Sequence, residues 1–207
     1  MSRKKIPSIV IPRLSFYYRA LLESRGSDFI SSEELAKLTG FNAAQIRKDL
    51  TYFGQFGIPS KGYKIEDLKQ KILNILGTDR KWNVGLVGVG NLGSALLSYR
   101  GFAKQGFEII SAFDNDLRKI GKKLEGVEVQ DISELSQTVK EKNIQIGIVA
   151  VPAIAAQEVI NTLIKAGVRA ILNFAPIRPQ VSNKVELLNI DLSIEVERLA
   201  FFLRRGR

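Results

Sequence analysis

The sequence predicts an α/β protein: an N-terminal winged helix-turn-helix domain followed by a Rossmann-type, doubly wound parallel sheet. Three observations carry this prediction: two helical segments joined by a glycine turn, a glycine-rich loop after an apolar run, and alternating apolar runs and helical segments beyond Trp82. Such alternation is typical of a parallel sheet covered by helices on both faces. We expect domains at residues 1–81 and 82–190, followed by a C-terminal helix over 191–207.

The composition is that of an ordinary globular chain. Its 207 residues are 45% hydrophobic and 25% charged, which suffices for one large or two small domains with a buried core. No apolar run approaches the roughly 20 residues of a membrane span, and no signal-peptide pattern follows Met1. We therefore expect a cytoplasmic protein with no membrane partner.

Two residue types are absent from the chain. Without cysteine there are no disulfides, no thiolate chemistry and no cysteine-bound metal. Without histidine the chain lacks the commonest general acid–base group and metal ligand, so an enzyme would have to rely on Asp, Glu, Lys or Tyr. We expect neither a catalytic residue nor a metal site.

The net charge of +10 is concentrated near the N-terminus. Residues 1–81 contain 15 Lys and Arg against 8 Asp and Glu, a net +7, whereas residues 82–207 contain 16 against 13. Many soluble proteins are basic, but the position of this excess favours a nucleic-acid-binding N-terminal domain.

The first segment has a helical pattern. Pro12 suits a first helical turn, and Gly26 would end the helix. Its expected apolar face comprises Leu14, Tyr18, Leu21 and Leu22. We interpret the aromatic run 16–18 as core and packing surface rather than as a platform for stacking bases.

The next two helices form the expected helix-turn-helix. Ser31 and Glu34 have the spacing of a capping box, Gly40 supplies a turn, and Asn42 suits the N-cap of the third helix. The apolar positions of that helix are Ala43, Ile46, Leu50 and Phe53. Two helices joined by a short glycine turn are typical of a helix-turn-helix motif.

A wing is expected after the third helix. The glycines and the proline between residues 53 and 65 suit a tight β-hairpin, and a hairpin in this place is a wing. A further helix over about 66–76 and a polar linker over 77–81 complete the domain.

Basic and polar side chains lie on the face of the third helix opposite its apolar positions. Such a face fits the major groove, where Arg can bond guanine and Lys can reach phosphates. The expected DNA-contacting residues are Gln45, Arg47, Lys48, Thr51, Lys61 and Tyr63. Gln45 could instead cap the helix, and the whole face could be merely solvated.

The second domain is expected to alternate strands with helices. The apolar runs are 84–87, 107–113, 127–129, 144–151 and 168–174, with a weaker run near 185–190. The helical segments are 91–104, 115–124, 131–142 and 154–166, and the chain ends in an amphipathic helix.

A glycine loop follows the first strand of this domain and opens its first helix. Gly88 permits a tight turn, Gly90 lets the backbone approach a pyrophosphate, and Gly93 lets the helix pack closely on the strand. The helix N-terminus offers free N–H groups to the phosphates. The flanking strand and helix supply the context that a lone glycine motif lacks.

A carboxylate ends the next strand. Asp114 lies 21 residues after Gly93, where it would accept hydrogen bonds from the adenine ribose hydroxyls and repel a 2′-phosphate. The sequence therefore predicts an NAD(H) site, while the nearby Arg118 and Lys119 keep NADP(H) open. The alternative is a glycine turn that binds no ligand.

The motifs of both domains resemble those of the Rex family of redox-sensing transcriptional repressors. In the first domain they are the segments 39–50, 53–57 and 62–63, and in the second they are 88–93, 150–153 and 173–176. They occur in the family's order and span nearly the whole chain. Pro59 and Ser60 depart from the pattern, because a further glycine is expected in the wing at position 60.

The resemblance implies a redox-controlled homodimer. Rex proteins bind operator DNA when NADH/NAD+ is low and release it when NADH binds their Rossmann domain. Their C-terminal helix is swapped onto the partner subunit, which we expect here for 191–207. Two recognition helices in a dimer imply a pseudo-palindromic operator. NADH must then bind the DNA-released form more tightly than the DNA-competent form.

The resemblance also supplies a set of switch residues. Arg13, Tyr99 and Asp191 match a trio in which the aspartate pairs with the tyrosine in one redox state and with the arginine in the other. Each residue has an alternative role: Arg13 as a surface charge or phosphate contact, Tyr99 as filling behind the glycine loop, and Asp191 as an N-cap.

The expected nucleotide contacts run from the glycine loop to the nicotinamide end. They are Gly88, Val89, Gly90, Asn91, Leu92, Gly93, Tyr99, Asp114, Val151, Pro152, Ala153, Ala175, Pro176 and Asp191. Those that could distinguish NADH from NAD+, which differ in charge and ring planarity, are Tyr99, Ala153, Ala175, Pro176 and Asp191.

Two other functions remain open from the sequence. An NAD-dependent oxidoreductase with a basic N-terminal extension would lack both a histidine for proton transfer and a substrate domain. A nucleotide-binding module similar to CoA-binding Rossmann domains would leave the basic N-terminal domain without a role. We therefore expect a redox-sensing repressor that binds DNA and NAD(H).

Overall fold

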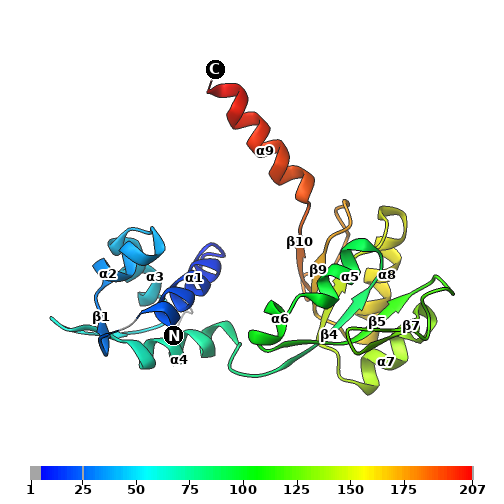
Figure 1. The fold of residues 1–207 in the computed structure, drawn as a ribbon, viewed down its shortest axis with the longest axis horizontal. Coiled ribbons are helices and arrows are strands. Elements are labelled where there is room, and N and C mark those ends of the chain that lie inside the picture. The colour runs from blue at the N-terminus through cyan, green and yellow to red at the C-terminus, as the bar shows by residue number, and fades with distance from the viewer. Residues whose placement is uncertain (1–5, 25, 207) are drawn as a thin grey trace. The chain divides into compact units, whose positions relative to one another are not determined.

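The computed structural model describes residues 6–24 and 26–206 and divides into two compact units, Met1–Arg80 and Lys81–Arg207 (Figure 1). Residues 1–5, Arg25 and Arg207 fall within the expected domains but lie outside the described residues. Among the helices that the structure describes, none is long and apolar enough to cross a membrane.

The first unit combines helices with a small antiparallel sheet. Its elements are α1 (Val10–Glu23), β1 (Phe29–Ile30), α2 (Ser32–Thr39), α3 (Ala43–Thr51), β2 (Gly57–Ile58), β3 (Gly62–Lys64) and α4 (Ile65–Leu76). The strand order is β1-β3-β2, so β2 and β3 form the expected wing hairpin. Strand β1 was not predicted, because two residues are too few to show alternation.

Local signals determine where the second and third helices begin. Ser31 and Glu34 form a capping box in which each side chain accepts a hydrogen bond from the other's backbone N–H. Gly40 ends α2 in the left-handed conformation, with φ at +72°. The side chain of Asn42 accepts a 2.7 Å hydrogen bond from the N–H of Ala44 and caps α3. The sequence prediction of these caps is confirmed.

The expected end of the first helix was wrong, and two of the four residues of its expected apolar face, Leu14 and Leu21, are buried. Helix α1 ends at Glu23 rather than at Gly26, because the chain becomes extended directly after Glu23. Tyr17 is fully buried in place of Tyr18, and Leu22 is 56% exposed. The buried stripe consists of Val10, Leu14, Tyr17, Ala20 and Leu21. This stripe begins before the proline and shares Leu14 and Leu21 with the expected one.

The second unit is a seven-stranded sheet with helices on both faces. Its elements are β4 (Trp82–Val87), α5 (Asn91–Ser98), α6 (Gly101–Lys104), β5 (Phe107–Asp114), β6 (Lys123–Leu124), β7 (Val127–Asp131), the 3₁₀ turn η1 (Ile132–Glu134), α7 (Leu135–Glu141), β8 (Ile146–Val149), α8 (Ala153–Ala166), β9 (Ala170–Asn173), β10 (Glu186–Asn189) and α9 (Leu192–Arg205). The strand order is β10-β9-β8-β4-β5-β7-β6, with only the β6–β7 pair antiparallel.

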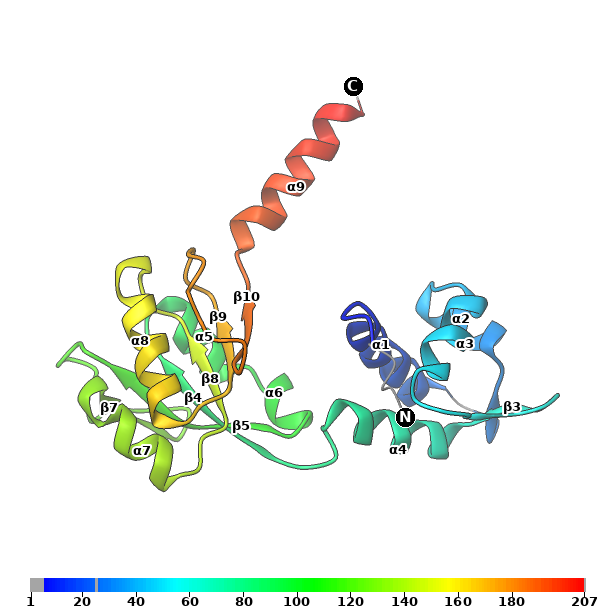
Figure 2. The same cartoon turned by 180° about the vertical axis from the view of Figure 1, so that it is seen from behind.

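The parallel strands follow the order of a Rossmann fold, in which the chain switches direction beside β4. Helices α7 and α8 cover one face of the sheet, where Val149, Ile160 and Leu163 are buried (Figure 2). Helices α5 and α6 cover the other face, where Leu86 and Ile148 are buried. Burial of apolar side chains on both faces is the main stabilising contribution and fixes the strand ends that form the site.

Two expected helices differ in the structure. Segment 115–124 is a series of turns followed by β6, because Asp116 accepts hydrogen bonds from the backbone and side chain of Arg118 and the chain then turns at Gly121, φ +78°. Segment 91–104 is two helices, α5 and α6, because Tyr99 is extended between them. Hydrogen bonds between a side chain and the nearby backbone, as at Asp116, compete with helix formation.

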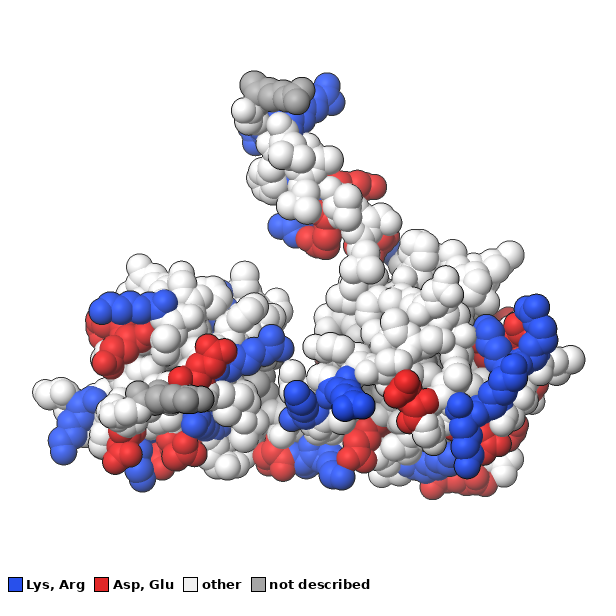
Figure 3. Space-filling model, viewed as in Figure 1, with Lys and Arg blue, Asp and Glu red and all other residues white. Residues whose placement is uncertain are grey.

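The C-terminal helix α9 extends away from the sheet (Figure 1). None of its side chains is buried. Its exposed large apolar residues are Leu192, Ile194, Val196, Leu199, Phe201, Phe202 and Leu203. Uncharged side chains occupy most of its visible surface in Figure 3. An apolar surface of this size on a single helix is typical of an interaction surface.

Candidate functional site

The glycine loop lies between the end of β4 and the start of α5. Gly88 has φ at +93°, and its N–H donates a 2.8 Å hydrogen bond to the carbonyl oxygen of Phe113 on β5. A Cβ atom on Gly88 would lie 2.5 Å from the carbonyl oxygen of Ala150, which follows β8. Only glycine satisfies both the backbone conformation and this close approach.

The other two glycines of the loop meet different surroundings. A Cβ atom on Gly93 would overlap the carbonyl oxygen of Gly88, so this glycine lets α5 approach the strand end. A Cβ atom on Gly90, the N-cap of α5, would have no neighbour within 4 Å. Open space in front of a helix N-terminus leaves room for an anionic ligand to meet the backbone N–H groups.

The carboxylate of Asp114 at the end of β5 is buried and already hydrogen-bonded. It accepts from the N–H of Val89 at 2.8 Å, from the N–H of Asp116 at 2.9 Å and from the ammonium group of Lys119 at 3.0 Å. Burial opposes ionisation, but the hydrogen bonds from Asp116, Lys119 and Val89 outweigh it and lower the pKa of Asp114. Asp114 therefore stays ionised and braces the glycine loop.

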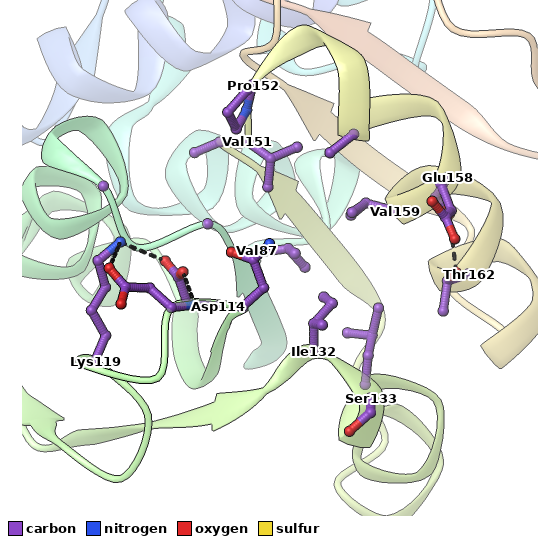
Figure 4. A pocket seen from close by; sticks show the side chains of 17 residues that line it. Val87, Asp114, Lys119, Ile132, Ser133, Val151, Pro152, Glu158, Val159 and Thr162 are labelled. Carbon is purple, nitrogen blue, oxygen red and sulfur yellow. Dashed lines mark hydrogen bonds and ion pairs between the residues drawn. The ribbon is translucent and has the colours of Figure 1, made fainter.

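A cleft of about 650 Å³ opens beside this carboxylate, at the carboxyl ends of the parallel strands. In Figure 4 Asp114 and Lys119 lie on one side of the cleft and Val159 of α8 lies on the other. The lining residues are Val87, Gly88, Gly90, Asp114, Asn115, Asp116, Lys119, Ile132, Ser133, Leu135, Ala150, Val151, Pro152, Ala155, Glu158, Val159 and Thr162. Ligands of open α/β sheets bind in this crevice.

Five of the expected nucleotide contacts line the cleft: Gly88, Gly90, Asp114, Val151 and Pro152. The remaining nine, which do not line it, are Val89, Asn91, Leu92, Gly93, Tyr99, Ala153, Ala175, Pro176 and Asp191. Val89 and Gly93 are buried beneath the loop, whereas Asn91 and Leu92 are exposed on the first turn of α5. The cleft therefore brings together the glycine loop and the carboxylate of Asp114, and the residues expected at the nicotinamide end do not line it.

Several cleft residues were missed from the sequence. Asn115 and Asp116 follow β5, and Ile132 and Ser133 follow β7. Lys119, which also follows β5, was expected only as a residue that keeps NADP(H) open. The signal that could have found them is position, because residues just after parallel strands gather at the same edge. Glu158 and Thr162 of α8 carried no such signal.

The motif at 173–176 is held by a buried amide. Asn173 is fully buried, and its side chain both accepts from the N–H of Ala175 at 3.1 Å and donates to the carbonyl oxygen of Ala175 at 2.9 Å. It also donates to the side chain of Asn189 on β10 at 2.9 Å. This network buries Ala175 and leaves Pro176 exposed after β9.

The expected DNA-contacting side chains of α3 have distinct partners. Arg47 donates to the hydroxyl oxygen of Ser32 at 2.6 Å and to the carboxylate of Glu33 at 2.8 Å. Lys48 is exposed, and the hydroxyl of Thr51 donates to its carbonyl oxygen at 2.7 Å. Arg47 is therefore oriented by α2, while Lys48 projects into solvent.

The wing contains two of the residues expected to contact DNA, Lys61 and Tyr63, and the unusual Ser60. Tyr63 is only 8% exposed and packs in the core of this unit, so little of its side chain is available to DNA. Lys61 is exposed beside it. Ser60 has φ at +64°, the left-handed conformation that glycine adopts most easily. Ser60 therefore adopts the backbone conformation that suits the glycine expected at this position.

A buried carboxylate that the sequence did not indicate lies on α3. Asp49 is fully buried and accepts two hydrogen bonds from Arg13, at 2.5 and 2.8 Å, and one from the hydroxyl of Tyr17 at 2.7 Å. It also accepts from the side chain of Gln45 at 2.7 Å. Burial raises the pKa of Asp49, but the hydrogen bonds from Arg13, Tyr17 and Gln45 outweigh it and lower the pKa overall.

The three expected switch residues fall in different surroundings. Arg13 is bonded to Asp49, within the first unit. Tyr99, in the second unit, is 57% exposed and packs edge-on against Phe102 with ring centroids 5.1 Å apart. Asp191 accepts a 2.9 Å hydrogen bond from the N–H of Ser193 and caps α9, the role given as its alternative.

Comparisons with known proteins agree with both halves of the fold. A family model described as "CoA binding domain" matches residues 79–177, and one described as "Putative DNA-binding protein N-terminus" matches residues 5–51. The structure of RSP in complex with β-NAD+ and operator DNA matches with a TM-score of 0.93 at 38% identity, covering 98% of this chain and 95% of RSP. RSP in complex with β-NADH matches with a TM-score of 0.86 at 36% identity, covering 98% and 96%.

A winged helix-turn-helix unit joined to a nucleotide-binding Rossmann unit defines a ligand-responsive transcriptional regulator. Redox-sensing transcriptional repressor Rex of Desulforamulus reducens is 48% identical over 98% of both chains. That of Carboxydothermus hydrogenoformans is 49% identical over 97% of this chain and 98% of its own. The chain belongs to the Rex family of redox-sensing transcriptional repressors. The predicted family is confirmed, and the oxidoreductase alternative is set aside because the relatives are repressors.

Proposed function

We propose that this chain binds NAD(H) in the cleft beside the glycine loop and operator DNA through α3 and the wing, and that NADH releases the DNA. The observation that carries the proposal is the open approach at Gly90 beside the buried carboxylate of Asp114. The names of its relatives and the contents of the RSP complexes support the same reading. As a repressor it would act in the cytoplasm.

The cleft suits the adenosine half of a dinucleotide. The glycine loop and the start of α5 provide backbone N–H groups for the pyrophosphate. Val87, Val151 and Val159 provide apolar walls for a base. The carboxylates of Asp114 and Asp116 repel a 2′-phosphate and favour NAD(H) over NADP(H).

The nicotinamide half would lie beyond the cleft. The contacts proposed for it are Tyr99, Ala153, Ala175, Pro176 and Asp191, the first four of which lie directly after α5, on α8 and after β9. Tyr99 and Pro176 are exposed and able to meet a ligand, whereas Ala175 is 4% exposed and would contribute backbone only.

DNA binding is assigned to the exposed cations of the first unit. Arg47 and Lys48 lie on the face of α3 opposite buried Ile46 and Leu50, and Lys61 lies on the wing. Arg47 can contact a guanine edge and Lys48 a phosphate. Gln45, Thr51 and the backbone around Ser60 complete the proposed surface.

We propose a homodimer in which the apolar surface of α9 packs on the partner subunit. Seven large apolar side chains of α9 are at least half exposed, which is unfavourable in water. Replacing Leu199 and Leu203 by Asp should give a monomer in sedimentation measurements, with Arg198→Asp as the matched surface control. A dimer that persists after the double change would contradict this assignment.

The function is tested by a gel shift with promoter DNA and NADH, NAD+ or no nucleotide. NADH should release the DNA, whereas NAD+ should leave it bound. If NADH leaves binding unchanged, the sensor proposal fails. If no pseudo-palindromic DNA binds, the assignment of α3 as a recognition helix fails.

A further inference from the structure

The carboxylate of Asp49 links α3, on which it lies, to α1. Its partners Arg13 and Tyr17 lie one turn apart on α1, and its partner Gln45 lies one turn earlier on its own helix, α3. Three side chains therefore meet a single fully buried carboxylate. A buried charge is tolerated only with such partners, so loss of one partner should disturb the position of the carboxylate.

This network constrains how α3 sits on α1. Two hydrogen bonds from Arg13 and one from the hydroxyl of Tyr17 hold the Asp49 carboxylate against α1. Because Asp49 is on α3, these bonds restrict rotation of that helix about its own axis. Arg47 and Lys48 precede Asp49 directly, so the same rotation determines where their side chains point.

The network also orients Gln45. One amide hydrogen of Gln45 is donated to Asp49, which turns the rest of the amide group in a single direction. Base readout depends on hydrogen-bond distances and angles that tolerate little displacement. Contacts with phosphates tolerate more, because they depend chiefly on charge.

We propose that Asp49 is a positioning residue for DNA recognition, which holds α3 in one rotation on α1 and the Gln45 amide in one orientation. The proposal rests on the DNA binding proposed above. It assigns Arg13 and Tyr17, which lie on α1, to sequence discrimination.

The test uses Tyr17→Phe in the full chain. Tyr17 is fully buried, so its hydroxyl cannot touch DNA, and the substitution removes one hydrogen bond from Asp49 while keeping the ring. Ile72→Val is the matched control, because Ile72 is fully buried in the same core but forms no hydrogen bond in the network. The probes are a duplex that the wild-type chain selects from a randomised pool and a scrambled duplex of equal length and composition.

Tyr17→Phe should lower the ratio of affinities for the selected and scrambled duplexes by roughly tenfold, the scale of one base contact. Affinity for the scrambled duplex should stay within about twofold, since the phosphate contacts remain. Ile72→Val should leave the ratio unchanged. In a Gln45→Ala background the effect of Tyr17→Phe should shrink, and strictly additive effects would remove Gln45 from the proposal.

An unchanged ratio in folded Tyr17→Phe would overturn the proposal and leave Asp49 a purely structural residue. Asp49→Asn should lower the ratio further if it folds, and Tyr17→Phe decides the matter if it does not. A wild-type chain that selects no duplex would overturn the proposed function as well, which is a distinguishable result.

Discussion

The ammonium group of Lys119 lies 3.0 Å from Oδ2 of Asp114, so the carboxylate at the end of β5 meets a cation of its own loop within the cleft. Asp116 also lines the cleft, and its oxygen lies 4.0 Å from the same ammonium group. Two carboxylates therefore share one lysine beside the position proposed for the adenine ribose. We therefore expect the selectivity between NADH and NADPH to depend on Lys119, which lies outside the glycine loop.

Lys119→Met should increase the preference for NADH over NADPH. Lys119 is the cleft cation that could attract a 2′-phosphate, and its loss leaves the two carboxylates uncompensated. We expect NADPH affinity to fall by about fivefold or more relative to NADH, the scale of one charge contact. Isothermal titration with both nucleotides measures the ratio. Lys165→Met is the control, because Lys165 is exposed on α8 and does not line the cleft.

Asp114→Ala should weaken NADH binding without weakening the binding of DNA in the absence of nucleotide. The change removes the proposed ribose acceptor and the brace on Val89. Loss of a hydrogen bond to a charged group costs about 1.5–3 kcal/mol, or roughly 10- to 150-fold in affinity. Titration of NADH into the chain and into its DNA complex measures both effects. Equal loss of both would mean that Asp114 is only structural.

Gly90→Ala and Gly93→Ala should separate ligand binding from folding. A methyl group at position 93 overlaps the carbonyl oxygen of Gly88, so we expect a loss of about 1–3 kcal/mol in the free energy of unfolding. A methyl group at position 90 meets no protein atom, so the fold should persist while NADH affinity falls. Thermal unfolding with and without NADH distinguishes them. Wild-type NADH affinity in Gly90→Ala would contradict the proposed pyrophosphate position.

The stability of the second unit should decline in acid through Asp114. Hydrogen bonds lower its pKa in the folded state, so its contribution to the free energy of unfolding is present above its unfolded pKa and is lost as pH falls through the folded value. The loss should therefore occur below about pH 4. Urea unfolding from neutral to acid pH should show a shallower decline for Asp114→Asn. An identical pH profile would argue against the lowered pKa.

Arg47→Ala and Lys48→Ala should affect DNA binding differently. Lys48 is exposed without an acidic partner among the described residues, so its loss should reduce the salt slope of binding by about one. Arg47 is oriented by Ser32 and Glu33, and its loss should cost about 1–3 kcal/mol at one base position. Fluorescence anisotropy over a range of salt concentrations separates the two. Equal, sequence-independent losses would assign both residues to phosphates.

Local signals were sufficient for much of the fold. The capping box of Ser31 and Glu34, the N-cap Asn42 and the glycine loop each require a particular backbone, so their residues report it directly. The apolar residues of segment 115–124 have helical spacing, but hydrogen bonds to Asp116 hold the segment in turns. The spacing of apolar residues does not reveal such side-chain hydrogen bonds, which compete with a helix.

Contacts between residues far apart in the chain could not be predicted from the sequence. Asp49 has the same spacing as any polar residue of an amphipathic helix, and its burial follows from Arg13 and Tyr17 more than thirty positions away. Tyr63 lies in a short hairpin whose inner face depends on pairing with Ile30 of the unpredicted strand β1. Lys119 reaches Asp114 from a segment of turns, which the sequence pattern had predicted to be helical.

We propose that NADH, in preference to NAD+, releases DNA from this chain. The most direct measurement is the anisotropy of a labelled selected duplex at a fixed total concentration of NADH and NAD+, while their ratio is raised. DNA should be released as the ratio increases, and Asp114→Ala should shift the release to higher NADH. Binding that stays constant at every ratio would contradict the proposal.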